Sequence, residues 1–386
     1  MDSFLKSTDV IDWKHPDILT RARSLAIGCD DQPAIARRCF EWVRDEIKHS
    51  HDHGLQPVTC SASEVLRVGS GFCYAKSHLL AALLRANGIP AALCYQRLSC
   101  NDEGTVFCLH GLNAVHLPEF GWYRLDARGN RADVDAQFIP PLERLAFRPS
   151  VPGEGDVPGL FAEPMPVVVA ALRSHSTAAE LWERLPDADL ATMKAMLTFE
   201  TRPATVDDAD TLALLAAAVF RDAYRSAFDS DQQVEDFIAT NFTPSVMSAE
   251  LEAGHAWYSI GLVSGIAAGF IKLERTAAPE CVECLPAIEL SKLYVLRPFH
   301  GCGIANVLME RGLEHASLSG ASQVWLCVWE RNARAAAFYR RWGFASVGEM
   351  SFLWSGVAFR DFVMTRRVTP TATIAVEARI ERLPAG

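Results

Sequence analysis

Residues 297–312 read Arg-Pro-Phe-His-Gly-Cys-Gly-Ile-Ala-Asn-Val-Leu-Met-Glu-Arg-Gly, and this stretch decides the fold of the second half of the chain. Small residues are concentrated at 300–305, directly before an apolar run that favours a helix. Small residues let backbone N–H groups approach a phosphate, and a helix N-terminus adds positive dipole charge. The stretch therefore predicts a phosphate-binding loop that opens a helix.

The segments on both sides strengthen this interpretation. Residues 288–295 alternate between apolar and polar side chains, which predicts a strand directly before the loop, and residues 323–328 predict the next strand. Asn332 then stands where a second helix would start, and apolar residues follow at helical spacing up to Trp342. A glycine-rich helix start alone would equally suit an ordinary loop, so the order of the segments carries the argument.

This order resembles the GNAT N-acetyltransferases, whose acetyl-CoA loop follows the pattern Gln/Arg-x-x-Gly-x-Gly/Ala. Here the pattern reads His300-x-x-Gly303-x-Ala305, so a histidine replaces the first Gln or Arg. The resemblance covers roughly residues 199–368. It implies a central, mostly antiparallel sheet and direct transfer of an acetyl group from acetyl-CoA, the cosubstrate, to a small-molecule or peptide amine.

The same resemblance implies roles for individual residues. Tyr339 would protonate the departing thiolate, although a tyrosine there also suits the core of an amphipathic helix. Strand backbone N–H groups at 294–296 would polarise the thioester carbonyl. The implied acetyl-CoA-binding residues are Tyr294, Val295, His300, Gly301, Cys302, Gly303, Ala305, Asn332 and Tyr339.

The chemistry also needs a base, because only a neutral amine attacks a thioester. Glu289, on the predicted strand before the loop, is the candidate and would act through water; a solvent-facing strand carboxylate is the alternative. The runs 328–332 and 359–364 resemble those of bacterial polyamine (spermidine-type) acetyltransferases, which implies a polyamine-like acceptor.

The first half of the chain predicts a different chemistry. Residues 69–88 begin with glycines and become a strongly apolar helix, with Cys73 in its first turn. A helix N-terminus lowers the pKa of a thiol and so favours the thiolate. Two strand-like runs follow, at 110–117 and 121–126.

A cysteine on a helix, a histidine on one strand and an aspartate on the next resemble the transglutaminase-like superfamily, whose fold is papain-like. The resemblance covers roughly residues 5–185 and implies Cys73 as nucleophile, His110 as base and Asp126 as the group that orients the imidazole. Taken singly, each of the three also suits a structural role. His116 and His78 are competitors for the histidine role; His116 shares a strand face with His110 because six residues is an even step.

The resemblance does not select one reaction. Transglutaminase-like domains include cross-linking acyltransferases, cysteine proteases, amidases and inactive binders, so a peptide or protein amide is the expected substrate class. The alternative is a non-catalytic peptide- or substrate-binding module that serves the acetyltransferase, and a third reading makes both domains degenerate. No calcium-loop pattern of the Asp-x-Asp-x-Asp-Gly kind occurs.

Composition limits the remaining classes. A formal net charge of −10 argues against non-specific nucleic-acid binding and is compatible with cationic substrates. The chain begins without a signal-peptide pattern and contains no apolar run of membrane-spanning length, so we expect a cytoplasmic protein without membrane association whose eleven cysteines stay reduced. Cys281 and Cys284 have no second pair at zinc-site spacing, so no metal is expected.

The predicted organisation is an α/β (α+β) two-domain chain, a papain-like domain followed by a GNAT acyl-CoA N-acyltransferase fold. Residues 148–159 are turn-rich and predict a long loop, with a short helix near 178–185 after it. We expect the transglutaminase-like domain at 1–198, the acetyltransferase domain at 199–368 and a C-terminal tail at 369–386.

Overall fold

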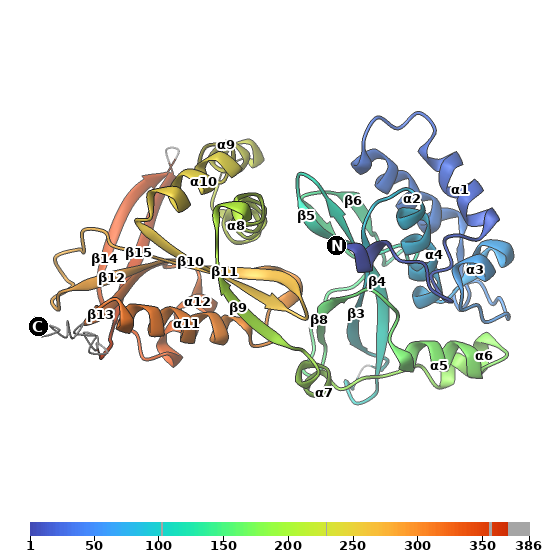
Figure 1. The fold of residues 1–386 in the computed structure, drawn as a ribbon. Helices are drawn as coiled ribbons and strands as arrows, with labels where there is room; N and C mark the ends of the chain where they lie inside the picture. Colours follow the sequence, from blue (N-terminus) through green and yellow to red (C-terminus); the bar gives the residue numbers. More distant parts are fainter. Residues whose placement is uncertain (102, 229, 355–356, 370–386) are drawn as a thin grey trace, which may run out of the picture.

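The computed structural model describes residues 1–101, 103–228, 230–354 and 357–369. It forms two lobes, one made by the first half of the chain and one by the second (Figure 1). The predicted C-terminal tail, 369–386, lies outside the described residues except for residue 369.

One central helix organises the first lobe. This helix, α4 (Cys73–Ala86), is rich in leucine and alanine and is buried from Cys73 to Arg85. It is surrounded by α1 (Pro16–Ala26), α2 (Gln32–Glu46) and α3 (Ala62–Val68). Such an all-round apolar helix has to be buried, which is why the predicted helix became the core element of this lobe.

A four-stranded antiparallel sheet packs against α4 in the order β5-β4-β3-β8. Its strands are β3 (Ala91–Ser99), β4 (Phe107–Leu117), β5 (Gly121–Leu125) and β8 (Gly155–Phe161). The prediction of a loop through residue 159 was wrong from Gly155 onward. There the backbone pairs with β3, and pairing with a neighbouring strand outweighs a local turn preference.

Shorter elements complete the first lobe. A 3-10 helix covers Asp2–Leu5, and α6 agrees with the predicted short helix. The remaining elements are β1 (Lys48–His49), β2 (Ser70–Gly71), β6 (Gln137–Ile139), β7 (Leu142–Arg144), α5 (Pro166–Ser174), α6 (Ala178–Glu183) and α7 (Leu190–Ala195).

The second lobe is built on a seven-stranded sheet in the order β14-β15-β13-β12-β11-β10-β9. Only the β12–β13 pair is parallel, so the mostly antiparallel sheet predicted from the sequence is confirmed. The strands are β9 (Phe199–Pro203), β10 (Ala256–Val263), β11 (Ile266–Glu274), β12 (Ala287–Val295), β13 (Gln323–Trp329), β14 (Ala345–Trp354) and β15 (Val357–Arg367).

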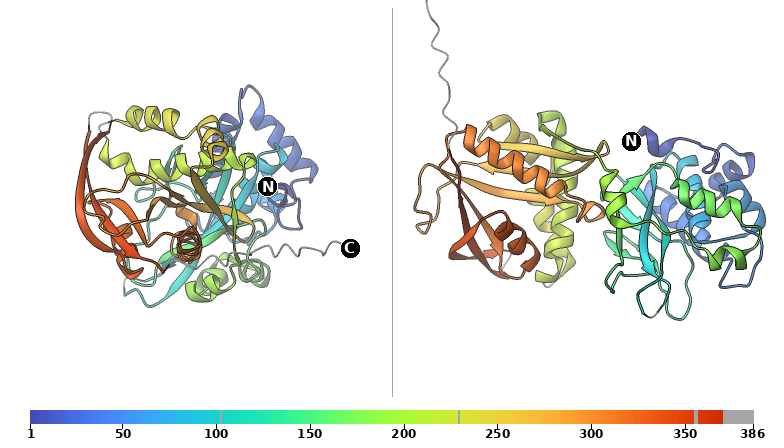
Figure 2. Two further views of the ribbon diagram at one scale, coloured as in Figure 1. Left: turned by 60° about the vertical axis from the view of Figure 1, so that its left-hand side comes forward. Right: turned by 90° about the horizontal axis from the view of Figure 1, so that it is seen from below.

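Helices cover both faces of this sheet (Figures 1 and 2). One face carries α8 (Ala209–Tyr224), α9 (Asp231–Asn241) and α10 (Pro244–Ala253). The opposite face carries α11 (Ile304–Leu318) and α12 (Ala333–Arg341). Three short 3-10 turns lie at 206–208, 225–227 and 297–299.

The parallel pair of strands opens part-way along its length. β12 and β13 pair only between 287–289 and 323–325, although both strands continue further. β13 stays paired with β15 as far as Trp329, which lies opposite Asp361. A gap therefore opens between the C-terminal ends of β12 and β13, at the level where the glycine-rich loop begins.

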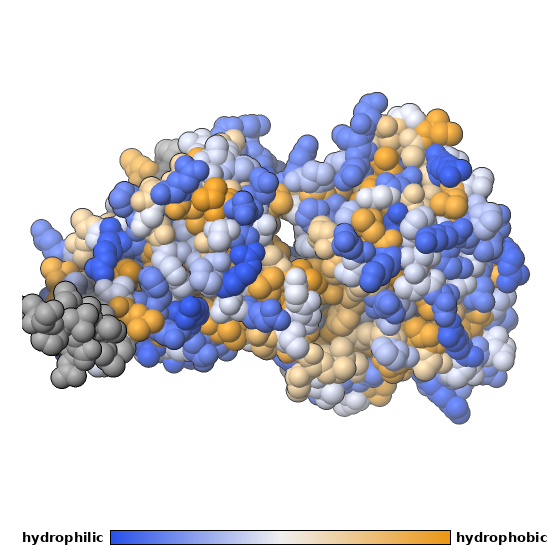
Figure 3. Space-filling model, in the orientation of Figure 1, coloured by the Kyte–Doolittle hydropathy of each residue, from blue (hydrophilic) through white to orange (hydrophobic). Residues whose placement is uncertain are grey.

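The lobes meet through apolar side chains. Phe4, Leu112 and Leu160 of the first lobe belong to the same buried apolar cluster as the core of the second. Figure 3 shows the two lobes with a hollow between them. The sheet of the second lobe begins at Phe199; the domain boundary near 198 stays a prediction.

Candidate active sites

Cys73 lies at the N-terminus of α4 and is 7% exposed. His110 comes from β4 and Asp126 directly follows β5, so adjacent strands bring the two together. The His110 Nε2 and Asp126 Oδ2 atoms are 2.7 Å apart, and His110 also hydrogen-bonds Cys73. The three residues that the sequence proposed as a triad are therefore adjacent.

Charge is already separated within this group. Burial raises the pKa of the Cys73 thiol, but the charge and hydrogen bond of His110 outweigh it and bring the pKa down to about 6. Burial lowers the pKa of His110, but Asp126 and then Cys73 raise it to about 10. Between these two values the favoured state is a thiolate beside an imidazolium.

Asp126 is fully buried and held by backbone donors. Burial raises the pKa of this carboxyl, whereas His110 lowers it, and the N–H groups of Arg128 and Ala146 lower it further by donating to its oxygens at 3.1 Å each. The net direction is downward, so Asp126 stays ionised and stabilises the imidazolium.

His49 is a member of this site that the sequence reasoning missed. It lies on β1, is 5% exposed and hydrogen-bonds Cys73 from another side. Its Nδ1 is 3.5 Å from Asp52 Oδ2, and Arg128 Nη1 lies 2.7 Å from the same carboxylate oxygen. Nothing local signals this role, because β1 reaches the thiol only by pairing with β2 just before α4.

The two competing histidines lie elsewhere. The His78 ring is fully buried, its Nδ1 is 2.8 Å from the Cys60 carbonyl oxygen, and burial lowers its pKa to about 4, which fits a neutral core histidine. The His116 ring packs edge-on against Trp122 at 5.4 Å, and it does not line the cavity at Cys73. Of the three histidines considered from the sequence, His110 is the one that reaches the thiol.

A cavity of about 330 Å³ opens over Cys73. Phe147 forms part of its wall and meets the His110 ring edge-on at 5.0 Å. Arg128, Arg131 and Arg148 add cationic groups to the rim. A thiolate at a helix N-terminus inside such a cavity can attack a carbonyl carbon, since backbone N–H groups are available for the oxygen that becomes negative.

The second site surrounds the glycine-rich loop. Gly303 is the N-cap of α11 at a φ of 120°, and Gly301 has a φ of 74°. Side chains rarely adopt these values, so both positions favour glycine. The loop brings the first turn of α11, with Ala305 in that turn, to the end of β12, and buries Cys302 beneath it. These features suit a pyrophosphate.

His300 does not take the part of the Gln or Arg it replaces. Its Nε2–H donates to the Val295 carbonyl oxygen at 2.8 Å, and its Nδ1 accepts from Arg334 at the same distance. Burial and the neighbouring Arg334 charge lower the pKa of His300, which keeps it neutral. Arg334, on α12, and Lys194, whose Nζ lies close to Gly301, are cationic groups beside the loop, and the sequence reasoning missed both.

The predicted proton donor lies in an aromatic core. Tyr339 is 8% exposed and its ring contacts Phe338 and Phe344. Burial, and then the nearby Tyr224, raise the pKa of Tyr339. Burial likewise raises the pKa of Tyr294. Both phenols therefore stay neutral near pH 7, as a proton donor must.

Asn332 and Glu289 have partners of their own. The Asn332 side chain caps α12, because its Oδ1 accepts from the Ala335 N–H at 3.0 Å. The Glu289 Oε2 atom accepts from the Thr276 hydroxyl at 2.6 Å. Burial raises the pKa of Glu289, whereas the Thr276 bond and the charge of Lys292 lower it; the net direction is upward.

Comparison with protein families separates the two halves. Residues 20–127 match the transglutaminase-like superfamily, and residues 217–344 match the acetyltransferase (GNAT) family. An uncharacterized N-acetyltransferase of Mycobacterium tuberculosis (strain H37Rv) is 32% identical over 161 residues, which are 42% of this chain and 98% of that protein. The chain belongs to the GNAT acetyltransferase family. Both family resemblances and the two-domain fold class predicted from the sequence are confirmed.

Other relatives are more distant. An uncharacterized N-acetyltransferase of Lactobacillus delbrueckii subsp. lactis is 24% identical over 152 residues, covering 39% of this chain and 88% of that one. Among solved structures, the PaiA N-acetyltransferase of Thermoplasma acidophilum in complex with coenzyme A has 20% identity and a TM-score of 0.37, covering 44% of this chain and 99% of that one. YncA of Salmonella typhimurium, a putative acetyltransferase with acetyl-CoA, has 14% identity and a TM-score of 0.35, covering 46% and 97%.

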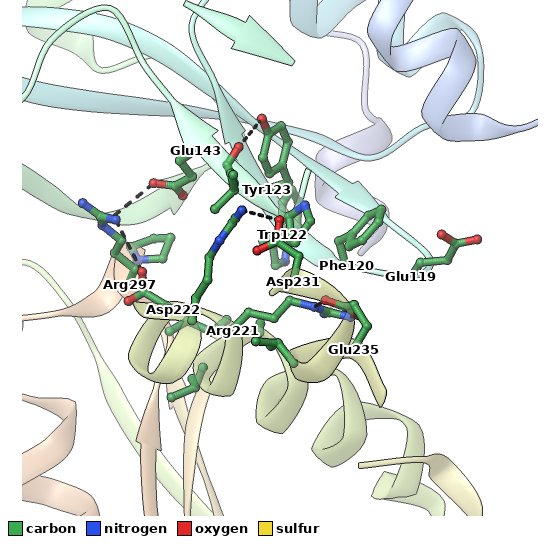
Figure 4. Close-up of a pocket in the computed structure, with 18 of the residues that line it drawn as sticks. Glu119, Phe120, Trp122, Tyr123, Glu143, Arg221, Asp222, Asp231, Glu235 and Arg297 are labelled. Atoms are coloured by element: carbon green, nitrogen blue, oxygen red, sulfur yellow. Dashed lines mark hydrogen bonds and ion pairs between the residues drawn. The ribbon is translucent and has the colours of Figure 1, made fainter. Parts of the chain in front are cut away.

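A cleft of about 640 Å³ lies between the transglutaminase-like domain and the GNAT domain (Figure 4). One wall is the end of β12, including Val295, together with α8; the other is formed by β5 and β7. Arg297 crosses the cleft, 3.4 Å from Asp222 Oδ1 and 3.9 Å from Glu143 Oε2. Arg148 lines both this cleft and the cavity over Cys73, so the two spaces are neighbours.

Two kinds of feature are absent from the described residues. No helix within them is long and apolar enough to cross a membrane. No group of three or more His, Cys, Asp and Glu side chains in the same part of the chain is arranged to hold a metal ion.

Proposed function

We propose that the GNAT domain binds acetyl-CoA along the end of β12 and over loop 300–305, and acetylates a cationic amine. The gap between β12 and β13, with the glycine-capped start of α11 beside it, is the observation that carries this proposal. Acetyl-CoA supplies the acetyl thioester. The groups that would hold it are the backbone of Tyr294 and Val295, the loop from His300 to Ala305, and the Asn332 side chain.

The other roles follow from the chemistry of amine acetylation. Of the backbone N–H groups expected at 294–296, that of Leu296 donates to the Ala268 carbonyl oxygen at 2.8 Å, so the Val295 N–H, on the opposite edge of β12, polarises the thioester carbonyl. Tyr339 gives its proton to the departing thiolate. Glu289 is the carboxylate proposed from the sequence to take the proton of the amine, through water. The acceptor we propose is polyamine-like, with peptide amines as the second class.

An acceptor screen tests this proposal. Acetyl-CoA consumption is measured with spermidine, lysine-containing peptides and amino sugars, and calorimetry measures acetyl-CoA binding to the same protein. Binding together with turnover of a cationic amine supports the assignment. A protein that does not bind acetyl-CoA would contradict it.

We propose that the transglutaminase-like domain uses Cys73 as a nucleophile on a peptide or protein amide. The Cys73 thiolate would attack the amide carbon, and His110 would give its proton to the amine as the C–N bond breaks. Cys73 would then carry the acyl group as a thioester, to be passed to water or to a second amine. The juxtaposition of Cys73, His110 and Asp126, with the shifted pKa values of the first two, supports this proposal.

A second candidate function is a binding module that presents its ligand to the GNAT domain. The low exposure of Cys73 and the packing of Phe147 against His110 favour it, since they limit access to the thiol. A thiol-reactive probe distinguishes the two. Selective labelling of Cys73, absent in Cys73→Ala, supports a nucleophile; an inert thiol supports the binding module.

The location we propose is the cytoplasm. All eleven cysteines are unpaired, and thiolate chemistry at Cys73 needs a reducing compartment. Fractionation of the producing cells tests this directly.

A further inference from the structure

Asp361 is a buried carboxylate that the roles above leave unexplained. It lies on β15, is 8% exposed, and its Oδ1 has no hydrogen-bond partner within the described residues. Buried charges are normally paired, because burying an unpaired one is costly. Burial, and then the charge of Glu330, raise the pKa of Asp361 to about 6. Asp361 therefore has an oxygen available to a donor group of a bound substrate.

The position of Asp361 relates it to acetyl transfer. In the sheet it lies opposite Trp329, the last residue of β13. β13 is the strand that separates from β12, and it lies between that gap and β15, so Asp361 is one strand away from the C-terminal end of the gap where the acetyl group is proposed to bind. Its charge also acts on Tyr224, whose pKa burial and then Asp361 raise to about 12, and Tyr224 in turn acts on Tyr339 and Tyr294.

Aromatic rings lie next to the carboxylate. Tyr224 stacks on Trp329 with ring centroids 5.6 Å apart, and Phe359 lies 5.8 Å from Trp329 and 6.3 Å from Tyr224. Phe359 is two residues from Asp361 on the same strand, so both project from one face of the sheet. Phe220 stacks on Tyr224 at 4.9 Å and Phe352 stacks on Phe359 at 5.8 Å, so the rings keep water away from the carboxylate, and charges interact more strongly where water is excluded. A carboxylate beside such rings suits an ammonium group.

Glu289 has a different environment. Besides its bond to Thr276, it lies among Lys272, Lys292 and Glu274. Lys272 is paired there with Glu250 and Glu274 at 3.0 Å each, so the carboxylates around Glu289 already have cations within the protein. The titratable groups that act on Asp361 are Tyr224 from α8, and Cys327 and Glu330 from β13 and the turn after it. Arg360, the neighbour on its own strand, is paired with Glu330 at 2.6 Å.

We propose that Asp361, with Tyr224, Trp329 and Phe359, forms the binding pocket for the ammonium group of the acceptor, and that Asp361 takes its proton by direct contact. This rests on the proposed acetyl transfer. The proton moves from R–NH₃⁺ to Asp361, and the freed lone pair forms the N–C bond to the thioester carbon. The C–S bond then breaks, the sulfur takes the Tyr339 proton, and the second nitrogen proton restores Tyr339. Asp361 passes its proton to solvent, so the products are the N-acetyl amine, the free thiol and one proton.

The test compares Asp361→Asn with Glu289→Gln, using spermidine, 1,4-diaminobutane and a lysine peptide as acceptor probes. We expect Asp361→Asn to lower kcat/KM for the accepted amine by about 10²-fold or more, the usual size of a general-base effect, with an unchanged Kd for acetyl-CoA. Wild-type kcat/KM should rise with pH through about 6, because the carboxylate must be ionised. In Asp361→Asn the rise of kcat/KM near pH 6 should disappear. The kcat/KM of this variant should instead follow the fraction of the amine that is neutral.

Glu349→Gln is the matched control. Glu349 is an exposed carboxylate on the neighbouring strand, 3.5 Å from Arg360, so its loss changes the charge equally but should leave the kinetics unchanged. Two results would overturn the inference. One is a larger loss of kcat/KM in Glu289→Gln than in Asp361→Asn, and the other is a rise of kcat/KM near pH 6 that persists in Asp361→Asn. Turnover of none of the three amines by a wild type that binds acetyl-CoA would refute the cationic pocket. A wild type that does not bind acetyl-CoA would instead refute the proposed function.

Discussion

The two candidate sites differ in how their charges are arranged before a substrate binds. Around Cys73, the charged groups of the triad are paired with one another: His110 bonds both the thiol and Asp126, and Asp126 also accepts two backbone N–H groups. In the GNAT domain, Tyr339 is neutral and the Asp361 Oδ1 has no partner within the described residues. In the first site the charges of the triad are paired within the protein, and in the second a buried carboxylate oxygen is not.

This difference corresponds to two kinds of acyl transfer. A covalent nucleophile must be a thiolate before its substrate arrives, so the counter-charge has to be part of the fold. Direct transfer between two bound substrates needs groups that become fully paired only in the ternary complex. The following variants test whether this contrast holds, in order of decreasing expected effect.

Tyr339→Phe should have the largest effect. If the phenol protonates the departing thiolate, kcat should fall by about 10²–10⁴-fold, because general acids usually contribute that much, while the Kd for acetyl-CoA stays the same. Steady-state kinetics and calorimetry measure the two quantities. Tyr258→Phe, which removes another buried hydroxyl of this domain, is the control. A kcat within about threefold of wild type would leave Tyr339 a packing residue.

His110→Ala should slow alkylation of Cys73 at pH 7 by about 10²-fold. The pKa of Cys73 would rise from about 6 to at least the ordinary thiol value of about 8.5, leaving little thiolate. The measurement is the iodoacetamide rate as a function of pH. Asp126→Asn should move the profile in the same direction but less, and His116→Ala should not move it. If the pH dependence of alkylation is the same in His110→Ala as in the wild type, the charges of this site are not paired before the substrate binds.

Gly303→Glu should weaken acetyl-CoA binding by at least about thirtyfold. A side chain at a φ of 120° is strained by about 1–3 kcal/mol, and the new anion would face the pyrophosphate. Calorimetry measures the Kd. Gly320→Glu puts the same side chain at a positive φ just after the far end of α11, so it should cost stability without changing affinity. Equal affinities in the two variants would disprove the phosphate-binding loop.

His49→Gln should have the smallest effect. His49 is a secondary cause of the low Cys73 pKa, after His110, so the alkylation profile should move upward by less than one pH unit. At pH 7 the rate should fall by less than about twofold. A shift as large as that of His110→Ala would mean that two histidines share the ionisation of the thiol equally.

Much of both sites could be predicted from the sequence because local patterns encode them. Alternation before the loop predicted β12, small residues predicted the start of α11, and the apolar run after Cys73 predicted α4. The two-domain fold class and both families followed and were confirmed. The individual site residues remain predictions, although Cys73, His110 and Asp126 do lie together.

Tertiary structure alone decided the groups that carry no local signal. His49 reaches Cys73 through the β1–β2 pair, Arg334 reaches His300 from another helix, and Asp361 is placed by the register of β13 and β15. β8 formed where the sequence suggested a loop, because β3 was there to pair with it. The sequence by itself determined the elements whose hydrogen bonds and apolar periodicity are local. Which polar groups became buried, paired or left without a partner depended on contacts between distant segments, and burial is what sets their pKa values.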